Sequence, residues 1–76
     1  MTITIIAYTE LKEYLGRDGT ASLDVLPGTT LGEVIDRLGL PGELIMSVVC
    51  DQKLEGLDSA VKEGCVYRVL PMLGGG

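Results

Sequence analysis

The sequence predicts an α+β domain in which one mixed sheet of four to five strands packs on a single main helix. Several short segments alternate apolar and polar residues as β-strands do, whereas residues 30–38 have the apolar spacing of an amphipathic helix. The chain has 76 residues, of which 46% are hydrophobic, enough for one small core but not for two domains. Because strands flank the helix, a right-handed crossover is expected to pair the later strands with the first.

The first third of the chain predicts a strand, a short helix and a second strand. Residues 2–8 are rich in β-branched side chains and place three apolar residues on one side: Ile3, Ile5 and Ala7. In residues 10–16, apolar side chains recur at the i, i+3, i+4 spacing of a helix: Leu11, Tyr14 and Leu15. Leu23 and Val25 then alternate with polar neighbours, which indicates a half-buried strand before the turn at Pro27.

Residues 30–38 carry the clearest helix signal. Thr30 and Glu33 have the spacing of a capping box, in which the hydroxyl accepts from the amide three residues on and the glutamate reaches back. The apolar residues fall at i, i+3, i+4 and i+7 and predict one core-facing stripe: Leu31, Val34, Ile35 and Leu38. Gly39 and Pro41 are expected to end the helix.

Two further strands are expected in the second half. Residues 44–50 are apolar almost throughout, which is typical of a strand inside a sheet, and Asp51 begins a turn. Residues 53–64 are polar and are interpreted as irregular. The last strand, residues 66–71, places two apolar side chains on one face: Tyr67 and Val69.

Composition excludes several classes of function. The net charge is −5 and the six basic residues are spread singly, so no basic patch is available for nucleic acid. No apolar run approaches the length of a membrane span, and the first residues lack the basic start of a signal peptide. We therefore expect a cytoplasmic protein with no membrane partner. An acidic surface favours association with a basic face on another protein.

The cysteines are interpreted as structural. Cys50 and Cys65 lack a CxxC spacing and the chain has no histidine, so neither a metal site nor a thiol nucleophile with a histidine base is expected. Free cysteine behaves as a small buried apolar residue. A disulfide or a redox role is the alternative.

Four stretches resemble the small sulfur carriers of the MoaD/ThiS family: YTELKEYLG, PGTTLGEVIDRL, KEGCVYRVLP and the terminal pair Gly75 and Gly76. The resemblance runs the whole length and implies a ubiquitin-like β-grasp domain over residues 1–71, followed by a flexible tail over residues 72–76. The chain departs from the family at Cys50 and Cys65, where carriers usually have an asparagine and an acidic residue.

The resemblance implies that the reactive group is the terminal carboxylate of Gly76. A carboxylate with a pKa near ~3.5 is ionised at neutral pH and is a poor electrophile, so it requires activation. In the family, an adenylating enzyme of the ubiquitin-activating type transfers AMP from ATP with Mg²⁺, and a persulfide donor then supplies sulfur to give a thiocarboxylate. The chain itself is expected to bind no cofactor or metal and to act as a co-substrate, or as the small subunit of a sulfurtransferase.

The tail suits insertion into another protein. From Met72 onward, five extended residues reach about 17 Å. Gly74 and Gly75 lack side chains and can thread a narrow channel. We expect Met72 and Leu73 to enter pockets on a partner, and Tyr8 to lie on an exposed sheet face that meets it. The alternatives are that Met72 and Leu73 cap the core, that Tyr8 is an ordinary strand residue, and that the glycines are an unselected terminus.

Several functions follow from such a tail. The favoured one is sulfur donation in molybdopterin biosynthesis, for molybdenum or tungsten cofactor, with the large subunit of molybdopterin synthase as partner. A carrier of the thiamine branch would serve thiazole synthase instead. A ubiquitin-like modifier would join Gly76 to lysine through an isopeptide bond, and a plain interaction module would not use the tail chemically.

Overall fold

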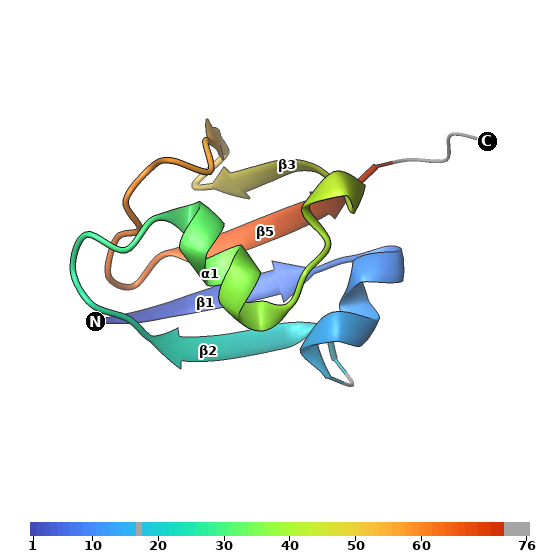
Figure 1. The fold of residues 1–76 in the computed structure, drawn as a ribbon, viewed down its shortest axis with the longest axis horizontal. Helices are drawn as coiled ribbons and strands as arrows, with labels where there is room; N and C mark the ends of the chain where they lie inside the picture. Colours follow the sequence, from blue (N-terminus) through green and yellow to red (C-terminus); the bar gives the residue numbers. More distant parts are fainter. Residues whose placement is uncertain (17, 73–76) are drawn as a thin grey trace.

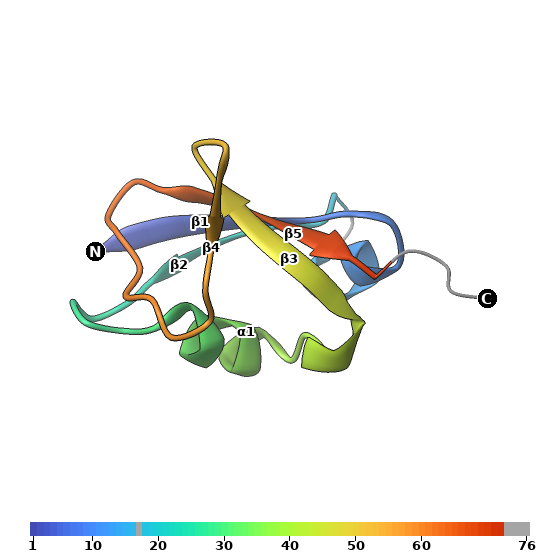
Figure 2. The same cartoon turned by 90° about the horizontal axis from the view of Figure 1, so that it is seen from above.

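The computed structural model describes residues 1–16 and 18–72, in which a five-stranded sheet is covered on one face by an α-helix (Figures 1 and 2). The strands are β1 (Thr2–Ala7), β2 (Thr20–Asp24), β3 (Ile45–Cys50), β4 (Lys53–Glu55) and β5 (Val66–Pro71). The helices are α1 (Leu31–Leu38) and two 3₁₀ helices, η1 (Thr9–Leu15) and η2 (Gly42–Leu44). Among these described helices, none has the length and apolarity needed to cross a membrane.

The strand order β2-β1-β5-β3-β4 makes the sheet mixed. The first and last strands are parallel neighbours at its centre, with Ile5 beside Tyr67 and Ala7 beside Val69, whereas the other neighbouring strands are antiparallel. The crossover through α1 therefore pairs a later strand with the first one, as the sequence predicts.

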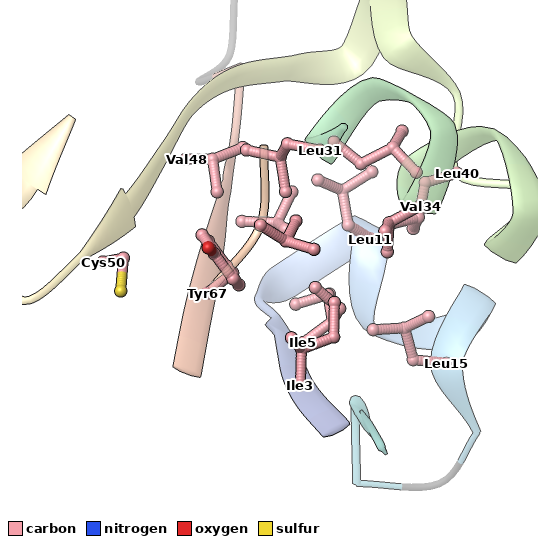
Figure 3. Packing of buried hydrophobic residues seen from close by; sticks show 14 of the residues in the cluster. Ile3, Ile5, Leu11, Leu15, Leu31, Val34, Leu40, Val48, Cys50 and Tyr67 are labelled. Carbon is pink, nitrogen blue, oxygen red and sulfur yellow. The ribbon is translucent and has the colours of Figure 1, made fainter. Parts of the chain in front are cut away.

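The core lies between α1 and the inner face of the sheet (Figure 3). The residues predicted to face inward from β1 and β5 are all buried: Ile3, Ile5, Ala7, Tyr67 and Val69. Most of the other core residues come from α1, η1, β3 and the loops: Leu11, Leu15, Val25, Leu31, Val34, Ile35, Leu40, Val48 and Val61. No polar or charged side chain is buried in the described part of the chain, so burial of apolar surface is the main source of stability.

Helix α1 has the predicted ends. The Thr30 Oγ1 accepts from the Glu33 N–H at 3.2 Å, and the Thr30 hydroxyl is also 3.2 Å from Glu33 Oε1. The capping box predicts that the Glu33 carboxylate accepts from the Thr30 amide. In the structure it contacts the Thr30 hydroxyl instead, because a hydroxyl can both accept and donate. Gly39 ends the helix at φ 74°, a left-handed conformation that favours glycine.

The segment predicted to be irregular, residues 53–64, contains β4. A two-residue loop, Asp51 and Gln52, connects β3 to β4, and both loop residues have positive φ (53° and 66°). This is the mirror-image turn whose twist matches that of a hairpin. The sequence reasoning missed β4 because it has three residues of mixed polarity, too few to show a period.

The rest of that segment accepts hydrogen bonds from the N-terminus of α1. The carbonyls of Leu57 and Ser59 accept from the amides of Gly32 and Leu31 at 2.7 and 2.9 Å. The first amides of a helix have no partner inside it, so this loop supplies hydrogen bonds that would otherwise be missing.

The helix predicted over residues 10–16 is the 3₁₀ helix η1. Leu11 and Leu15 are buried as expected, but Tyr14 is 47% exposed, so the predicted stripe contains two residues and not three. The segment begins at Thr9 with a φ of 50° and has the tighter 3₁₀ winding, on which α-helical spacing does not define a face.

Candidate functional site

The C-terminal end of β5 is held by β3 and η2. Ile45 pairs with Pro71, and the backbone N–H of Met72 donates to the carbonyl of Leu44 at 2.7 Å. Pro71 is buried, whereas Met72 is 53% exposed. Backbone hydrogen bonding therefore continues to the last described residue, which fixes the point from which the chain continues toward Gly76.

Only two of the predicted site residues lie in the described part of the chain, Met72 and Tyr8. The other four lie outside the described residues: Leu73, Gly74, Gly75 and Gly76. The exposure of the Met72 side chain contradicts the alternative that this residue caps the core. It leaves Met72 available to contact another protein.

Tyr8 lies at the same end of the sheet as Met72. It is half-buried and extended, and it follows β1 directly, one residue beyond the parallel pair of Ala7 and Val69. The register therefore places Tyr8 beside Leu70, and strand alternation puts it on the sheet face opposite α1. The backbone carbonyl of Tyr8 accepts from Leu11 at 3.1 Å, which connects this position to η1.

Two exposed apolar residues at this end of β3 were missed by the sequence reasoning. Leu44 belongs to η2 and is 37% exposed, and Met46 in β3 is 54% exposed at an irregularity between Ile45 and Ser47. We call Leu44, Met46 and Met72 the apolar rim. The apolar run at residues 44–50 predicts a strand that is buried on both faces. In the structure only one face of β3 is covered, and a continuous apolar run does not distinguish these two cases.

The sheet face opposite α1, which we call the outer face, carries a cation among aliphatic side chains. Arg68 is exposed in β5, and the register places it between Ile6 of β1 and Val49 of β3. Val49 in turn pairs with Leu54 of β4, which is 76% exposed. Within the described residues the one ion pair joins the Met1 amino group and Asp24 at 3.6 Å, so Arg68 has no carboxylate partner there.

A cluster of possible metal ligands lies at the other end of the sheet. The Sγ atoms of Cys50 and Cys65 and a carboxylate oxygen of Asp51 are all within 4.8 Å of one another, the only such group in the described chain. It is remote from Met72, because Cys65 precedes β5 and Met72 follows it. The sequence reasoning placed both cysteines against the core, which holds for Cys50 but leaves Cys65 half-buried.

Comparison with known proteins finds no matching family model and no matching curated protein. Solved structures do match. SAMP1, a small archaeal modifier protein of Haloferax volcanii, has a TM-score of 0.78 at 20% identity, with 100% of both chains covered. A Haloferax volcanii protein solved in solution has a TM-score of 0.77 at 22% identity, covering 100% of this chain and 87% of the other.

A chain from a complex of subunits 1 and 2 of the molybdopterin-converting factor from Helicobacter pylori also matches. Its TM-score is 0.63 at 17% identity, with 100% of both chains covered. These structural likenesses establish the fold. It is the ubiquitin-like β-grasp that the resemblance to the MoaD/ThiS carriers predicts. The neighbours are thus a modifier and a subunit of the molybdopterin-converting factor.

Proposed function

We propose that this protein is a ubiquitin-like sulfur carrier whose Gly76 carboxylate is adenylated by a partner enzyme and then converted to a thiocarboxylate. One observation carries the proposal. The β-grasp domain hydrogen-bonds its backbone up to Met72, at an end of the sheet with exposed apolar side chains, and the sequence then ends in three glycines. The domain supplies a rigid base, and the glycines supply an acyl group without steric crowding.

The chemistry requires only that the domain present its C-terminal carboxylate to the partner enzyme. A carboxylate oxygen of Gly76 attacks the α-phosphorus of ATP in the partner, and pyrophosphate leaves. A persulfide sulfur then attacks the acyl carbon, AMP leaves, and a thiol reduces the resulting acyl disulfide to release the thiocarboxylate. ATP, Mg²⁺ and the persulfide belong to the partners, so this chain acts as a co-substrate.

The apolar rim and the outer face are the proposed contacts with that partner. Ordering a residue in an active site costs about 1–2 kcal/mol of backbone entropy, and glycine loses more than other residues. The partner must recover this through contacts elsewhere, and exposed Met72, Met46 and Leu44 offer apolar surface beside the base of the tail. Arg68 among aliphatic residues fits a partner surface that combines apolar groups with a carboxylate.

The favoured recipient of the sulfur is a pterin precursor, with this chain as the small subunit of a molybdopterin synthase. The structural likeness to a chain in the molybdopterin-converting factor complex supports this choice. A thiazole synthase of thiamine biosynthesis is the alternative recipient. A second function, protein modification through an isopeptide bond from Gly76 to lysine, is favoured by the likeness to SAMP1.

Adenylation of the purified chain tests the proposal. The full-length protein, incubated with ATP, Mg²⁺ and the adenylating enzyme from the same organism, should form acyl-AMP at Gly76, detected by intact mass and by pyrophosphate release. A variant lacking Gly75 and Gly76 should form none while unfolding at the same temperature. Pyrophosphate release that persists without the two glycines would overturn the proposal.

Recovery of the protein from cells separates the two functions. A carrier should show replacement of one terminal oxygen by sulfur in its intact mass. A modifier should instead leave its C-terminal glycines on lysines of other proteins. For the recipient, mixing the thiocarboxylate form with either synthase subunit should yield product with only one of them.

The apolar rim has its own test. Met72→Glu and Met46→Glu should each raise the KM of the adenylating enzyme for this chain at least roughly tenfold, because they place a charge in an apolar contact. The matched control is Leu26→Glu, which changes an exposed leucine (78%) that follows β2 and is distant in sequence from the rim. Equal KM values for all three variants would exclude the rim as a contact.

A further inference from the structure

We propose that Cys50 and Cys65 form a reversible intramolecular disulfide, with a small-molecule disulfide such as oxidised glutathione as the oxidant. The two Sγ atoms lie 2.8 Å apart and both thiols are free. A bonded pair lies at about 2.0 Å, so closure requires a movement of less than about 1 Å. This proposal does not rest on the proposed function, because it uses neither Gly76 nor the apolar rim.

Both cysteines are held by the backbone on the same side of the sheet. Val49 pairs with Arg68, so the register places Cys50 opposite Tyr67 and makes Cys65 its diagonal neighbour. The Cys65 carbonyl accepts from Thr4 at 3.0 Å, and its amide donates to Lys62 at 3.1 Å. Because both backbones are fixed, the thiols are already adjacent in the folded protein. The chain entropy that is lost when the two residues come together is therefore lost on folding, before the disulfide forms.

The two thiols differ in their access to solvent. Cys50 is 5% exposed and lies at one edge of the core (Figure 3), whereas Cys65 is half-buried. An oxidant therefore reaches Cys65 first. Burial, together with the nearby Cys65, Asp51 and Glu55, raises the pKa of Cys50 to about 12, so Cys50 is a thiol at neutral pH and Cys65 is the sulfur expected to react first.

The exchange balances as two steps. The Cys65 thiolate attacks one sulfur of oxidised glutathione, forms a mixed disulfide and releases one glutathione thiolate. Cys50 then loses its proton and attacks the Cys65 sulfur, and the second glutathione leaves. The protein has lost two electrons and two protons, and one oxidised glutathione has become two reduced ones.

The geometry favours a disulfide over a metal site at the same atoms. Zn–S bonds of about 2.3 Å in tetrahedral geometry would hold two sulfurs roughly 3.8 Å apart. The observed 2.8 Å is shorter, and the only further donor in the described cluster is the exposed carboxylate of Asp51. Two buried or half-buried thiols with one carboxylate are therefore better placed to bond to each other.

The pair also lies away from the C-terminus. Cys65 precedes β5 and Pro71 ends it, and six extended residues place them roughly 17 Å or more apart. Disulfide formation therefore links the end of the β3–β4 hairpin to the start of β5 without contacting Met72. The expected result is a more stable domain with an unchanged C-terminal base.

Equilibration in glutathione buffers tests the proposal. The folded protein should lose both free thiols together, with an intact mass lower by two hydrogens and a proteolytic fragment that joins Cys50 to Cys65. The equilibrium constant for the disulfide should be about a hundredfold larger for the folded protein than for the chain in concentrated guanidinium, since the closed loop spans 15 residues. By the same cycle, the disulfide should raise the folding constant about a hundredfold.

Two serine variants sharpen the result. Cys50→Ser should stop at the mixed disulfide on Cys65, and Cys65→Ser should leave Cys50 unmodified at neutral pH. Three outcomes would overturn the proposal: a mixed disulfide that persists in the unaltered protein, an equilibrium constant no larger folded than unfolded, or stoichiometric Zn²⁺ binding that protects both thiols from oxidation.

Discussion

Thr30 is the residue on which the start of α1 depends. Its hydroxyl accepts from the Glu33 amide at 3.2 Å, and alanine at this position would leave that amide to water. We expect Thr30→Ala to lower the free energy of unfolding by about 1 kcal/mol. Urea unfolding followed by circular dichroism measures the change.

The matched control is Thr20→Ala, which removes an exposed threonine hydroxyl at the start of β2. Its effect should stay within about 0.5 kcal/mol. Equal losses for the two variants would mean that the hydroxyl of Thr30 is not a significant cap.

Gln52 is a residue whose backbone does not suit its side chain. It has a φ of 66° in the hairpin loop, where a residue with a Cβ is disfavoured by roughly 1–2 kcal/mol. Glycine in turn lowers the free energy of unfolding by about 0.5–1 kcal/mol relative to alanine, because its backbone loses more conformational entropy on folding. Gln52→Gly should therefore stabilise the domain by about 0.5 kcal/mol, measured by urea unfolding, whereas Gln52→Ala should bring no gain.

At the scale of elements, the fold depends on the contact between α1 and the sheet. Leu31 is 1% exposed on α1, whereas Leu54 of β4 is 76% exposed on the outer face. Leu31→Ala should lower the free energy of unfolding by about 2–5 kcal/mol because it leaves a cavity under the sheet. Leu54→Ala should change it by less than about 0.5 kcal/mol, and calorimetry distinguishes the two.

Two of the elements that the sequence predicted correctly, β5 and α1, have a clear period. Residues 66–71 alternate through a whole strand and match β5, and residues 30–38 complete two helical turns and match α1 with its cap. β4 has only three residues and η1 only seven, so neither shows a period that specifies its type. β4 pairs with β3 across the two-residue loop, and η1 contacts β1, so the form of each depends on contacts that the residues inside the segment do not specify.

For the whole molecule, two buried acids predict how stability depends on pH. Burial raises the pKa of Cys50 from 9.0 to about 12 and that of Tyr67 from 10.0 to about 12. The folded state therefore keeps protons that the unfolded chain releases above pH 9 to 10. The stability from these groups is fully present below pH 9 and is lost progressively as the pH rises toward 12.

Urea unfolding from pH 7 to 11.5 under reducing conditions measures this loss. The double variant Cys50→Ala and Tyr67→Phe should show a smaller decline over the same range. It should also be less stable at pH 7, because the amide of Lys62 loses the Tyr67 hydroxyl that accepts from it at 3.0 Å. A decline of the same size in both proteins would show that other groups control the alkaline transition.

The sequence alone also predicted part of the candidate site. It proposed Met72 as a contact for a partner, and it placed Tyr8 at the end of the first strand, which in the structure ends one residue earlier at Ala7. It did not find Leu44 and Met46, because an apolar run reads as buried whether one face of the strand is covered or two. Met46 lies at the irregularity of β3 between Ile45 and Ser47, and Leu44 lies in η2 before that strand begins.

By itself, the order of residues determined the fold class, the central helix with its ends, and the first and last strands. These properties follow from local spacing and from backbone preferences, which act between residues near in sequence. Only the tertiary structure decided that Cys50 and Cys65 lie 2.8 Å apart, that Arg68 lies between Ile6 and Val49, and that the carbonyl of Leu44 accepts from the amide of Met72. Such neighbours come from the register between strands, which long-range packing selects and no local pattern encodes.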